Sequence, residues 1–243
     1  TIAFHNVRMD MSAGTPLQNT SQTGHASVWL DNVEVFGSLA NGGTMVPIFE
    51  PTDAGNLYVT GCDVHDLSNT PFTLTNLIRN TQIHDCFVHG ANDPYLMINT
   101  TIDNIVARPN NPDDHVDGIF WYNPGVDENS IVYGATLTNI DGLCLMSDQP
   151  PMDIAVINVS ATATADAAGG QSQFGKVNYT LTEKHIVIDD LTLTNQSLVL
   201  VATTGNTWSD SIIENSVLWD LFDQPNPVVN CTKTDGTPIP NQS

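Results

Sequence analysis

A short alternation of apolar and polar positions recurs from one end of the chain to the other. Each copy has the order apolar, any residue, apolar, any residue, turn residue, apolar, as in Val28–Val33. A period of two places successive side chains on opposite faces of a β-strand. The turn position of the nine copies is occupied by Asn6, Asn32, Gly61, Asn80, Asn104, Gly134, Asn158, Asp190 and Asn215. The pattern predicts many short strands, each ending at a turn.

The spacing of these turn residues favours one all-β architecture. Successive turn residues lie 19 to 32 residues apart. Asn tolerates left-handed backbone angles, and stacked Asn side chains can hydrogen-bond to one another along a pile of coils. We therefore predict a right-handed parallel β-helix of about nine coils over residues 1–222, with inward stacks that include Val28, Leu30, Val33 and Val35. A β-sandwich explains less, because it gives no reason for Asn at one phase of every repeat.

Coil length indicates where segments leave the rod, since a minimal coil needs about 20 residues. The predicted loops are Ser12–Ala26, Phe36–Ala54, Arg108–His115 and Ala161–Val177. Residues 223–243 contain four prolines and are predicted to form a tail. The first strand begins at Ile2 with no capping helix before it, so the first coil is expected to be open to self-association or to a partner chain.

Charge restricts the partners. The chain of 243 residues has 6 Lys and Arg against 27 Asp and Glu, a formal net charge of −21. Nucleic acid is bound by neutralising its phosphates with Lys and Arg, so we exclude it as a partner. No apolar run approaches the roughly 18 residues of a membrane-spanning helix, so membrane insertion is not expected. Neutral partners are favoured.

The Asn-X-Ser/Thr sequons and the cysteines bear on the compartment. Sequons occur at Asn19, Asn99, Asn158, Asn178, Asn195, Asn230 and Asn241. Their number predicts a secreted glycoprotein, and the first six are the predicted glycosylation sites. Cys62, Cys86, Cys144 and Cys231 lack the C-x-x-C spacing of a zinc site, so no metal cofactor is expected from them. Two disulfides or buried free thiols both fit these four positions.

Candidate chemistry lies in a second repeat. Asp117-Gly118 and Asp141-Gly142 each precede an apolar segment, 24 residues apart, and a weaker copy places Asp93 another 24 residues upstream. In register, these three acids would form a row on adjacent coils, with histidines close by. Like charges at that distance favour protonation of at least one carboxyl group, as a proton donor requires.

This row predicts a carbohydrate site. Inverting hydrolysis of a glycosidic bond uses one protonated and one ionised carboxyl group, about 6.5–9.5 Å apart. We predict Asp117 and Asp141 as the catalytic pair, with Asp93 tuning them electrostatically. The predicted substrate-binding residues are His115, Trp121, Tyr122, Tyr95 and His89.

At these residues the chain resembles the pectinase-like glycoside hydrolases with a right-handed β-helix, the polygalacturonase and dextranase families. His115–Ile119 is similar to their Asp-Gly element and Asn139–Gly142 to their Asn-x-Asp-Asp element. The resemblance covers about 45 residues, 108–152, and implies catalysis by Asp117 and Asp141. Gly142 stands where the family has its second Asp, and the family's Gly-His-Gly and substrate-binding cations are missing. Without those cations, a neutral glucan-like polymer is the expected substrate.

Other interpretations of the same residues remain open. Asp-Gly is a good turn pair, so the repeated Asp can be structural. Asp113, Asp114, His115 and Asp117 offer hard ligands compatible with Ca²⁺. His65-Asp66 and His84-Asp85 share one phase and are expected to be outward-facing stacked side chains. The alternative to an enzyme is a structural or adhesive β-helix subunit of an extracellular filament, fibre or surface assembly.

Overall fold

The computed structural model of the chain describes residues 1–12, 27–38, 56–109, 111, 115–122, 129–147, 153–174, 185–200, 212–218, 221–222 and 228–241. All regular structure in these residues is β-strand. The larger sheet contains β1 (Ile2–His5), β2 (Arg8–Asp10), β3 (Ser27–Asp31), β4 (Glu34–Phe36), β5 (Asn56–Thr60), β6 (Asp63–His65), β7 (Leu77–Arg79), β8 (Gln82–Phe87), β10 (Leu96–Ile98), β11 (Thr101–Val106), β13 (Ser130–Tyr133), β14 (Thr136–Ile140), β16 (Asp153–Ala163), β18 (His185–Thr194), β20 (Ile212–Glu214), β21 (Val217–Leu218), β23 (Val228–Val229) and β24 (Thr232–Lys233). The smaller sheet contains β9 (His89–Asn92), β12 (Asp117–Trp121), β15 (Leu143–Ser147), β17 (Gly170–Phe174), β19 (Gln196–Leu200) and β22 (Leu221–Phe222).

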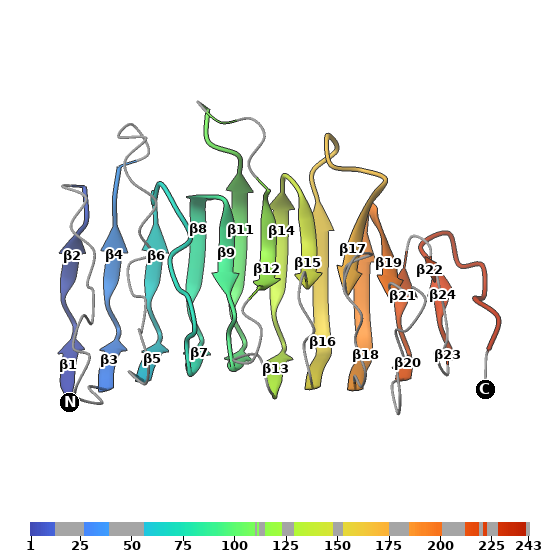
Figure 1. Ribbon diagram of the computed structural model, residues 1–243, viewed down its shortest axis with the longest axis horizontal. Helices are drawn as coiled ribbons and strands as arrows, with labels where there is room; N and C mark the ends of the chain where they lie inside the picture. Colours follow the sequence, from blue (N-terminus) through green and yellow to red (C-terminus); the bar gives the residue numbers. More distant parts are fainter. Residues whose placement is uncertain are drawn as a thin grey trace.

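The strands succeed one another along the long axis of the molecule in chain order (Figure 1). Each pairs in parallel with the equivalent strand of the next turn of the chain, as β1 does with β3 and β2 with β4. In the smaller sheet, β12 likewise lies between β9 and β15. The predicted all-β class is confirmed, and the long parallel sheets agree with a β-solenoid.

The core is one continuous apolar cluster that runs from the first turns of the chain to the last. The inward positions predicted in the second repeat, Val28, Leu30, Val33 and Val35, are all at most 5% exposed. Equivalent side chains of later turns continue the same stacks, because parallel pairing places like positions above one another.

Left-handed corners lie between consecutive strands or, at Asn104, Asn158 and Asp190, within one longer strand. All nine turn residues predicted from the repeat have positive φ, between 49° and 67°. Stacked corners also bond to each other, since Asn230 donates from Nδ2 to Asn215 Oδ1 at 2.9 Å. The proposed reason for Asn at the turn is therefore confirmed.

One corner was predicted in the wrong stack. The amide of Asn80 donates to Ile98 O and that of Asn99 to Tyr133 O, so Asn99 continues the first ladder of corners. Asn104 belongs to a second ladder, beside Asp85. The error arises because the segments before Asn99 and before Asn104 have the same alternation and each leads to a left-handed residue.

Two segments predicted to leave the rod contribute strands instead. Within the predicted loop 161–177, β16 continues to Ala163 and β17 joins the smaller sheet. Within the predicted tail, β23 and β24 pair with β20 and β21. In each case buried side chains, such as Phe174 and Val228, hold the segment against the core. The predicted loops 12–26 and 36–54 lie almost wholly outside the described residues.

The described part of the chain has no helix that is long and apolar enough to span a membrane.

Candidate functional site

The candidate site lies on the smaller sheet, where β12 carries a fully buried acid. Asp117 is 0% exposed and is the first residue of β12. Parallel pairing places it beside His89 of β9 on one side and Leu143 of β15 on the other. Removing a carboxylate from water costs several kcal/mol unless hydrogen bonds or opposite charges compensate, so the partners of Asp117 are informative.

Two imidazoles approach one oxygen of this carboxylate. His115 Nδ1 lies 2.7 Å from Asp117 Oδ2 with hydrogen-bond geometry, and His89 Nδ1 lies 3.1 Å from the same atom. Among the described residues, the second oxygen, Oδ1, has no hydrogen-bond partner. A buried acceptor without a partner is rare in native proteins and calls for a water, an ion or a ligand group as donor.

The two histidines differ in access to solvent. The side chain of His115 is 54% exposed, whereas that of His89 is 10% exposed. The hydrogen-bond contact through Nδ1 fixes the orientation of the His115 ring and directs its Nε2 away from the carboxylate. His89 Nδ1 lies within ion-pair distance of Asp117, but it has no hydrogen-bond partner among the described residues. His115 therefore combines a buried anionic partner with an exposed face, the arrangement that a proton-transfer group needs.

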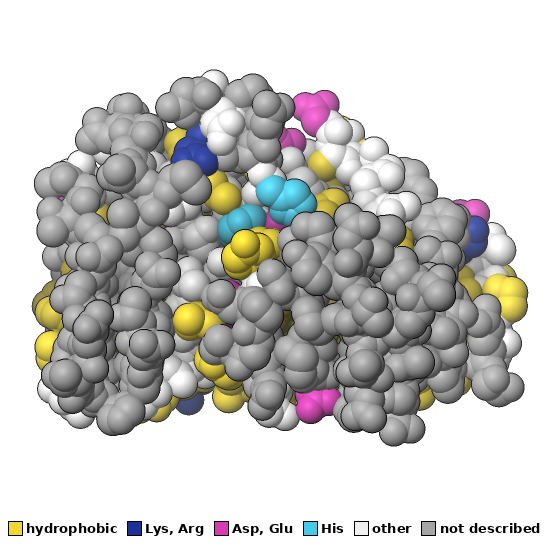
Figure 2. All heavy atoms as spheres, viewed as in Figure 1, with side chains coloured by type: hydrophobic (Ala, Val, Ile, Leu, Met, Phe, Trp, Pro, Cys, Tyr) yellow, Lys and Arg dark blue, Asp and Glu magenta, His cyan; other side chains and the backbone are white. Residues whose placement is uncertain are grey.

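Aromatic side chains border the pair. The ring of Phe120 is 4.7 Å from that of His89 and 5.7 Å from that of His115. The ring centroids of Tyr122 and Phe120 are 5.4 Å apart, and Tyr122 is 46% exposed. Figure 2 shows histidine and hydrophobic side chains together at the surface on the face that carries β9 and β12. Such a surface can hold a ring stacked next to an acid–base group.

The predicted row of three aspartates is wrong. The position equivalent to Asp117 on β9 is His89, and Asp93 lies after the end of that strand. Asp93 has φ of 48°, and its Oδ1 accepts a hydrogen bond of 2.6 Å from the Tyr122 amide. The side chain satisfies the backbone amide that follows β12 on the next turn of the chain, which is a structural role.

The second Asp-Gly pair, Asp141-Gly142, lies just before β15, the strand next to β12. Asp117 pairs with Leu143, so Asp141 stands two residues before the position equivalent to Asp117. Asp141 precedes β15 and accepts a hydrogen bond from Thr164 Oγ1 at 3.0 Å. At Gly142, an added Cβ would overlap the carbonyl oxygen of Val116. Since Leu143 N donates to that oxygen at 2.8 Å, the obstacle is fixed main chain. The Gly that departs from the glycosidase motif is thus required by the backbone.

One of the predicted stacking residues does not border this surface. Trp121 is 0% exposed, donates from Nε1 to Ser130 Oγ at 2.9 Å and packs 5.7 Å from Phe174. The prediction that it contacts a sugar is wrong, because this end of β12 turns the indole into the core. Tyr95 is half-buried and precedes β10 of the larger sheet.

No protein-family model, curated protein or solved structure matches this chain. The resemblance to β-helix glycosidases therefore remains a prediction from the Asp-Gly motifs.

The sequence contains an indication that Asp117 pairs with His89, although the 24-residue repeat favours a different alignment. A glycine follows each of them, Gly90 and Gly118, and an added Cβ at Gly118 would lie 2.6 Å from Cys144 O. At Gly90 a Cβ would overlap the Ile102 side chain and lie 2.6 Å from Gly118 O. Aligning the two glycines, 28 residues apart, would have given the true register.

A metal site and reactive thiols find no support in the part of the chain that the structure describes. No three His, Cys, Asp or Glu side chains there converge in a way that could hold a metal ion. Asp113 and Asp114, named as Ca²⁺ ligands, lie outside the described residues. The four cysteines are free and buried, and burial raises the pKa of Cys86 and of Cys144 to about 12.

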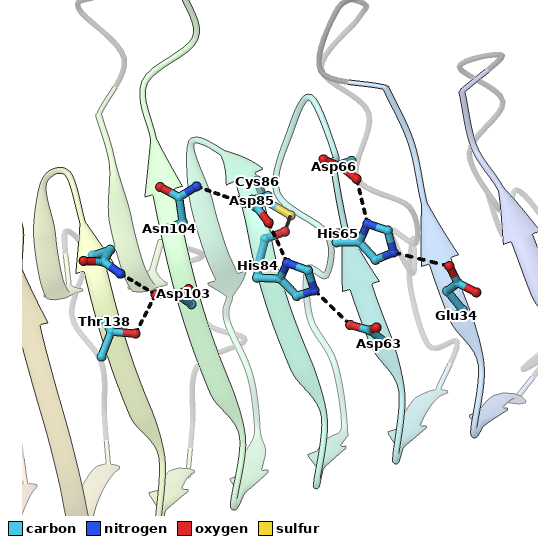
Figure 3. A network of polar contacts seen from close by, with 11 residues as sticks. Glu34, Asp63, His65, Asp66, His84, Asp85, Cys86, Asp103, Asn104 and Thr138 are labelled. Carbon is cyan, nitrogen blue, oxygen red and sulfur yellow. Dashed lines mark hydrogen bonds and ion pairs between the residues drawn. The ribbon is translucent and has the colours of Figure 1, made fainter.

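A second polar cluster lies on the outer face of the larger sheet (Figure 3). The rings of His65 and His84 stack with centroids 5.0 Å apart, as predicted from their common phase. His65 contacts Asp66 at 2.7 Å and Glu34 at 3.5 Å through its two nitrogens. Each imidazole in this cluster is clamped between two carboxylates.

The same clamp makes His84 sensitive to pH. Burial by itself lowers the pKa of His84, but hydrogen bonds to Asp85 at 2.7 Å and Asp63 at 3.0 Å outweigh it, so the pKa is raised above 6.5. A group whose pKa is higher in the folded state than in the unfolded state stabilises the fold fully below about pH 6.5. This stabilisation is lost as the pH rises through the folded-state pKa. We expect the urea midpoint to fall between pH 6 and pH 9, and to fall less in His84→Gln.

A matched variant tests the assignment to the clamp. His5→Gln removes an exposed imidazole that contacts Asp31 at 2.8 Å. This variant is expected to keep the pH dependence of the unmutated chain. An identical pH slope in His84→Gln and the unmutated protein would show that the clamp is not its source.

Proposed function

We propose that this chain is a secreted, right-handed parallel β-helix of about nine coils that binds and hydrolyses a neutral polysaccharide on the face formed by the smaller sheet. The observation that carries the proposal is Asp117, a fully buried carboxylate in contact with two histidines and with one oxygen unpartnered among the described residues. A turn acid would be satisfied by backbone amides, as Asp93 is. A donor from a ligand, such as a sugar hydroxyl, would satisfy Asp117.

In the proposed reaction, Asp117 and Asp141 share the work of an inverting hydrolysis. One carboxyl group protonates the glycosidic oxygen, so that the bond to the leaving sugar breaks with a neutral leaving group. The other accepts a proton from the water whose oxygen bonds to the anomeric carbon. His115 holds the Asp117 carboxylate through its 2.7 Å contact and relays protons between it and solvent. The role of Asp93 is limited to the turn beside this surface.

Charge supports a neutral substrate. The net charge of −21 disfavours approach of a polyanion, and the candidate surface presents imidazole and aromatic groups. Secretion is part of the proposal and rests on the sequons. Asn99, Asn158 and Asn230 are exposed, whereas Asn195 is half-buried and donates to Ala163 O; Asn19 and Asn178 lie outside the described residues.

Sugar binding can be tested with two tyrosines of equal exposure. Tyr122 borders the site and Tyr133 lies on the larger sheet, each 46% exposed. Loss of a ring that stacks on a sugar is expected to cost roughly 1 kcal/mol, or about a five-fold weaker Kd. Affinity electrophoresis in gels containing different neutral glucans should show weaker retardation for Tyr122→Ala and no change for Tyr133→Ala. Equal retardation of both variants, or no retardation of the unmutated chain by any glucan, would contradict the proposal.

The alternative is a structural or adhesive rod within an extracellular assembly. This function predicts that the rod associates with other chains and that the Asp117 site has no effect on the association.

A further inference from the structure

His115 and Asp117 form a contact of the kind that activates a histidine as a base. His115 Nδ1 lies 2.7 Å from Asp117 Oδ2 with hydrogen-bond geometry, and the carboxylate is fully buried while the imidazole side chain is 54% exposed. A carboxylate at one ring nitrogen orients the imidazole and stabilises the imidazolium that forms when the other nitrogen takes a proton. The attraction is stronger for a buried carboxylate, because water screens it less.

A comparison with the other histidines sets this pair apart. His5, His65 and His84 also contact an aspartate through Nδ1, at 2.7 to 2.8 Å. Their aspartates are 41% to 53% exposed, whereas Asp117 is 0% exposed. At His65 and His84, a second carboxylate also faces Nε2. Within the described part of the chain, only the His115 pair joins a buried acid to a histidine side chain that is more than half exposed.

One base of this kind is sufficient for one class of hydrolysis. Inverting cleavage of a glycosidic bond needs an acid and a base on two separate carboxyl groups. An ester carbonyl is attacked by water directly, and one imidazole serves both halves of the reaction, first as a base and then as an acid. The contact between Asp117 and His115 therefore supports ester hydrolysis without a second carboxylate.

We propose that this site also removes ester-linked acyl groups from the polysaccharide, with His115 as the general base and Asp117 as the residue that positions it. The inference rests on the proposed function for binding of a neutral polysaccharide, but it does not need the pair of carboxyl groups. His115 Nε2 takes a proton from water, and the water oxygen bonds to the acyl carbon to give a tetrahedral intermediate. The bond from the acyl carbon to the sugar oxygen then breaks, as the imidazolium returns its proton to that oxygen. The products are a sugar hydroxyl and a carboxylic acid, so water is the only co-reactant.

The surroundings of His115 suit this reaction. The ring of Phe120 lies 5.7 Å from that of His115, and Tyr122 follows at 5.4 Å from Phe120, so apolar surface is available for the acyl group. The ester is neutral, and the net charge of −21 does not repel it. The acid that is released ionises at neutral pH and is repelled, which favours its departure.

Release of acetate from a soluble acetylated glucan tests the inference. The probe is an unactivated ester, since exposed imidazoles by themselves cleave activated ones. His115→Gln keeps a donor for the buried carboxylate but cannot carry the proton, so it should lower kcat/KM for acetate release by about 10²–10⁴-fold. His5→Gln removes the matched imidazole beside an exposed aspartate and should retain the full rate. A thermal melt verifies that each variant is folded.

Acetate and reducing ends are measured in the same reaction, so that the two activities are separated. Acetate release without reducing ends would support this inference and contradict the proposed glycosidic cleavage. Reducing ends without acetate, or equal acetate release by His115→Gln and the unmutated chain, would overturn the inference alone. If His115→Gln does not fold, the unmutated chain decides. General-base catalysis moves a proton in the rate-limiting step, so acetate release should be slower in D₂O, and equal rates in the two solvents would exclude His115 as the base.

Discussion

Asp117→Asn is expected to lower the kcat/KM for hydrolysis of a neutral glucan by about 10²–10⁴-fold, the usual contribution of a general acid or base. Asn preserves the shape of the buried side chain but cannot exchange a proton. Production of reducing ends measures the rate, and a thermal melt verifies that the variant is folded. The effect is the largest that we expect from a single substitution on activity.

The chain supplies a matched control. Asp31 and His5 form an exposed pair at 2.8 Å, chemically the same contact as that between Asp117 and His115. Asp31→Asn makes the same change away from the candidate site and should retain full activity. If Asp117→Asn is folded and as active as the unmutated chain, Asp117 is a structural acid and the enzyme proposal fails.

Gly142→Ala is expected to destabilise the fold by about 3 kcal/mol, the upper range for overpacking. The added Cβ would meet Val116 O, which is held by the Leu143 amide, so relief requires breaking a ladder hydrogen bond between adjacent turns. Urea unfolding with a constant m-value measures the loss.

A second glycine separates steric conflict from backbone strain. Gly61 has φ of 62° and nothing within 4 Å of an added Cβ. It occupies a corner of the ladder in which most other corners are Asn, as at Asn32 and Asn80. Gly61→Asn should therefore change stability by only a few tenths of a kcal/mol. Equal losses in Gly61→Asn and Gly142→Ala would contradict the steric account.

The steric conflict at Gly142 bears on the resemblance to β-helix glycosidases. The aspartate that the motif requires at position 142 cannot be restored in this backbone, so an active site here must operate without it. The histidines around Asp117 are the groups present instead. Hydrolytic activity that is present in the unmutated chain and absent in Asp117→Asn would identify a site built on an Asp–His contact.

The sequence by itself determined the strand pattern, the corners and the core. Alternation fixes which side chains of a strand face inward, and Asn or Gly at a corner is dictated by local backbone sterics, so both are visible in a single chain. The stacking of the His-Asp motifs at residues 65–66 and 84–85 was predictable for the same reason.

Only the tertiary structure decided the register between turns. Each turn contributes two segments with the same alternation to the larger sheet, and loops of variable length separate the turns, so Asn99 and Asn104 are equally good matches to one ladder. Parallel pairing across the stack resolved this choice, and it brought His89, instead of Asp93, beside Asp117. Register is a property of contacts between segments far apart in the chain, and it decides which side chains form a site.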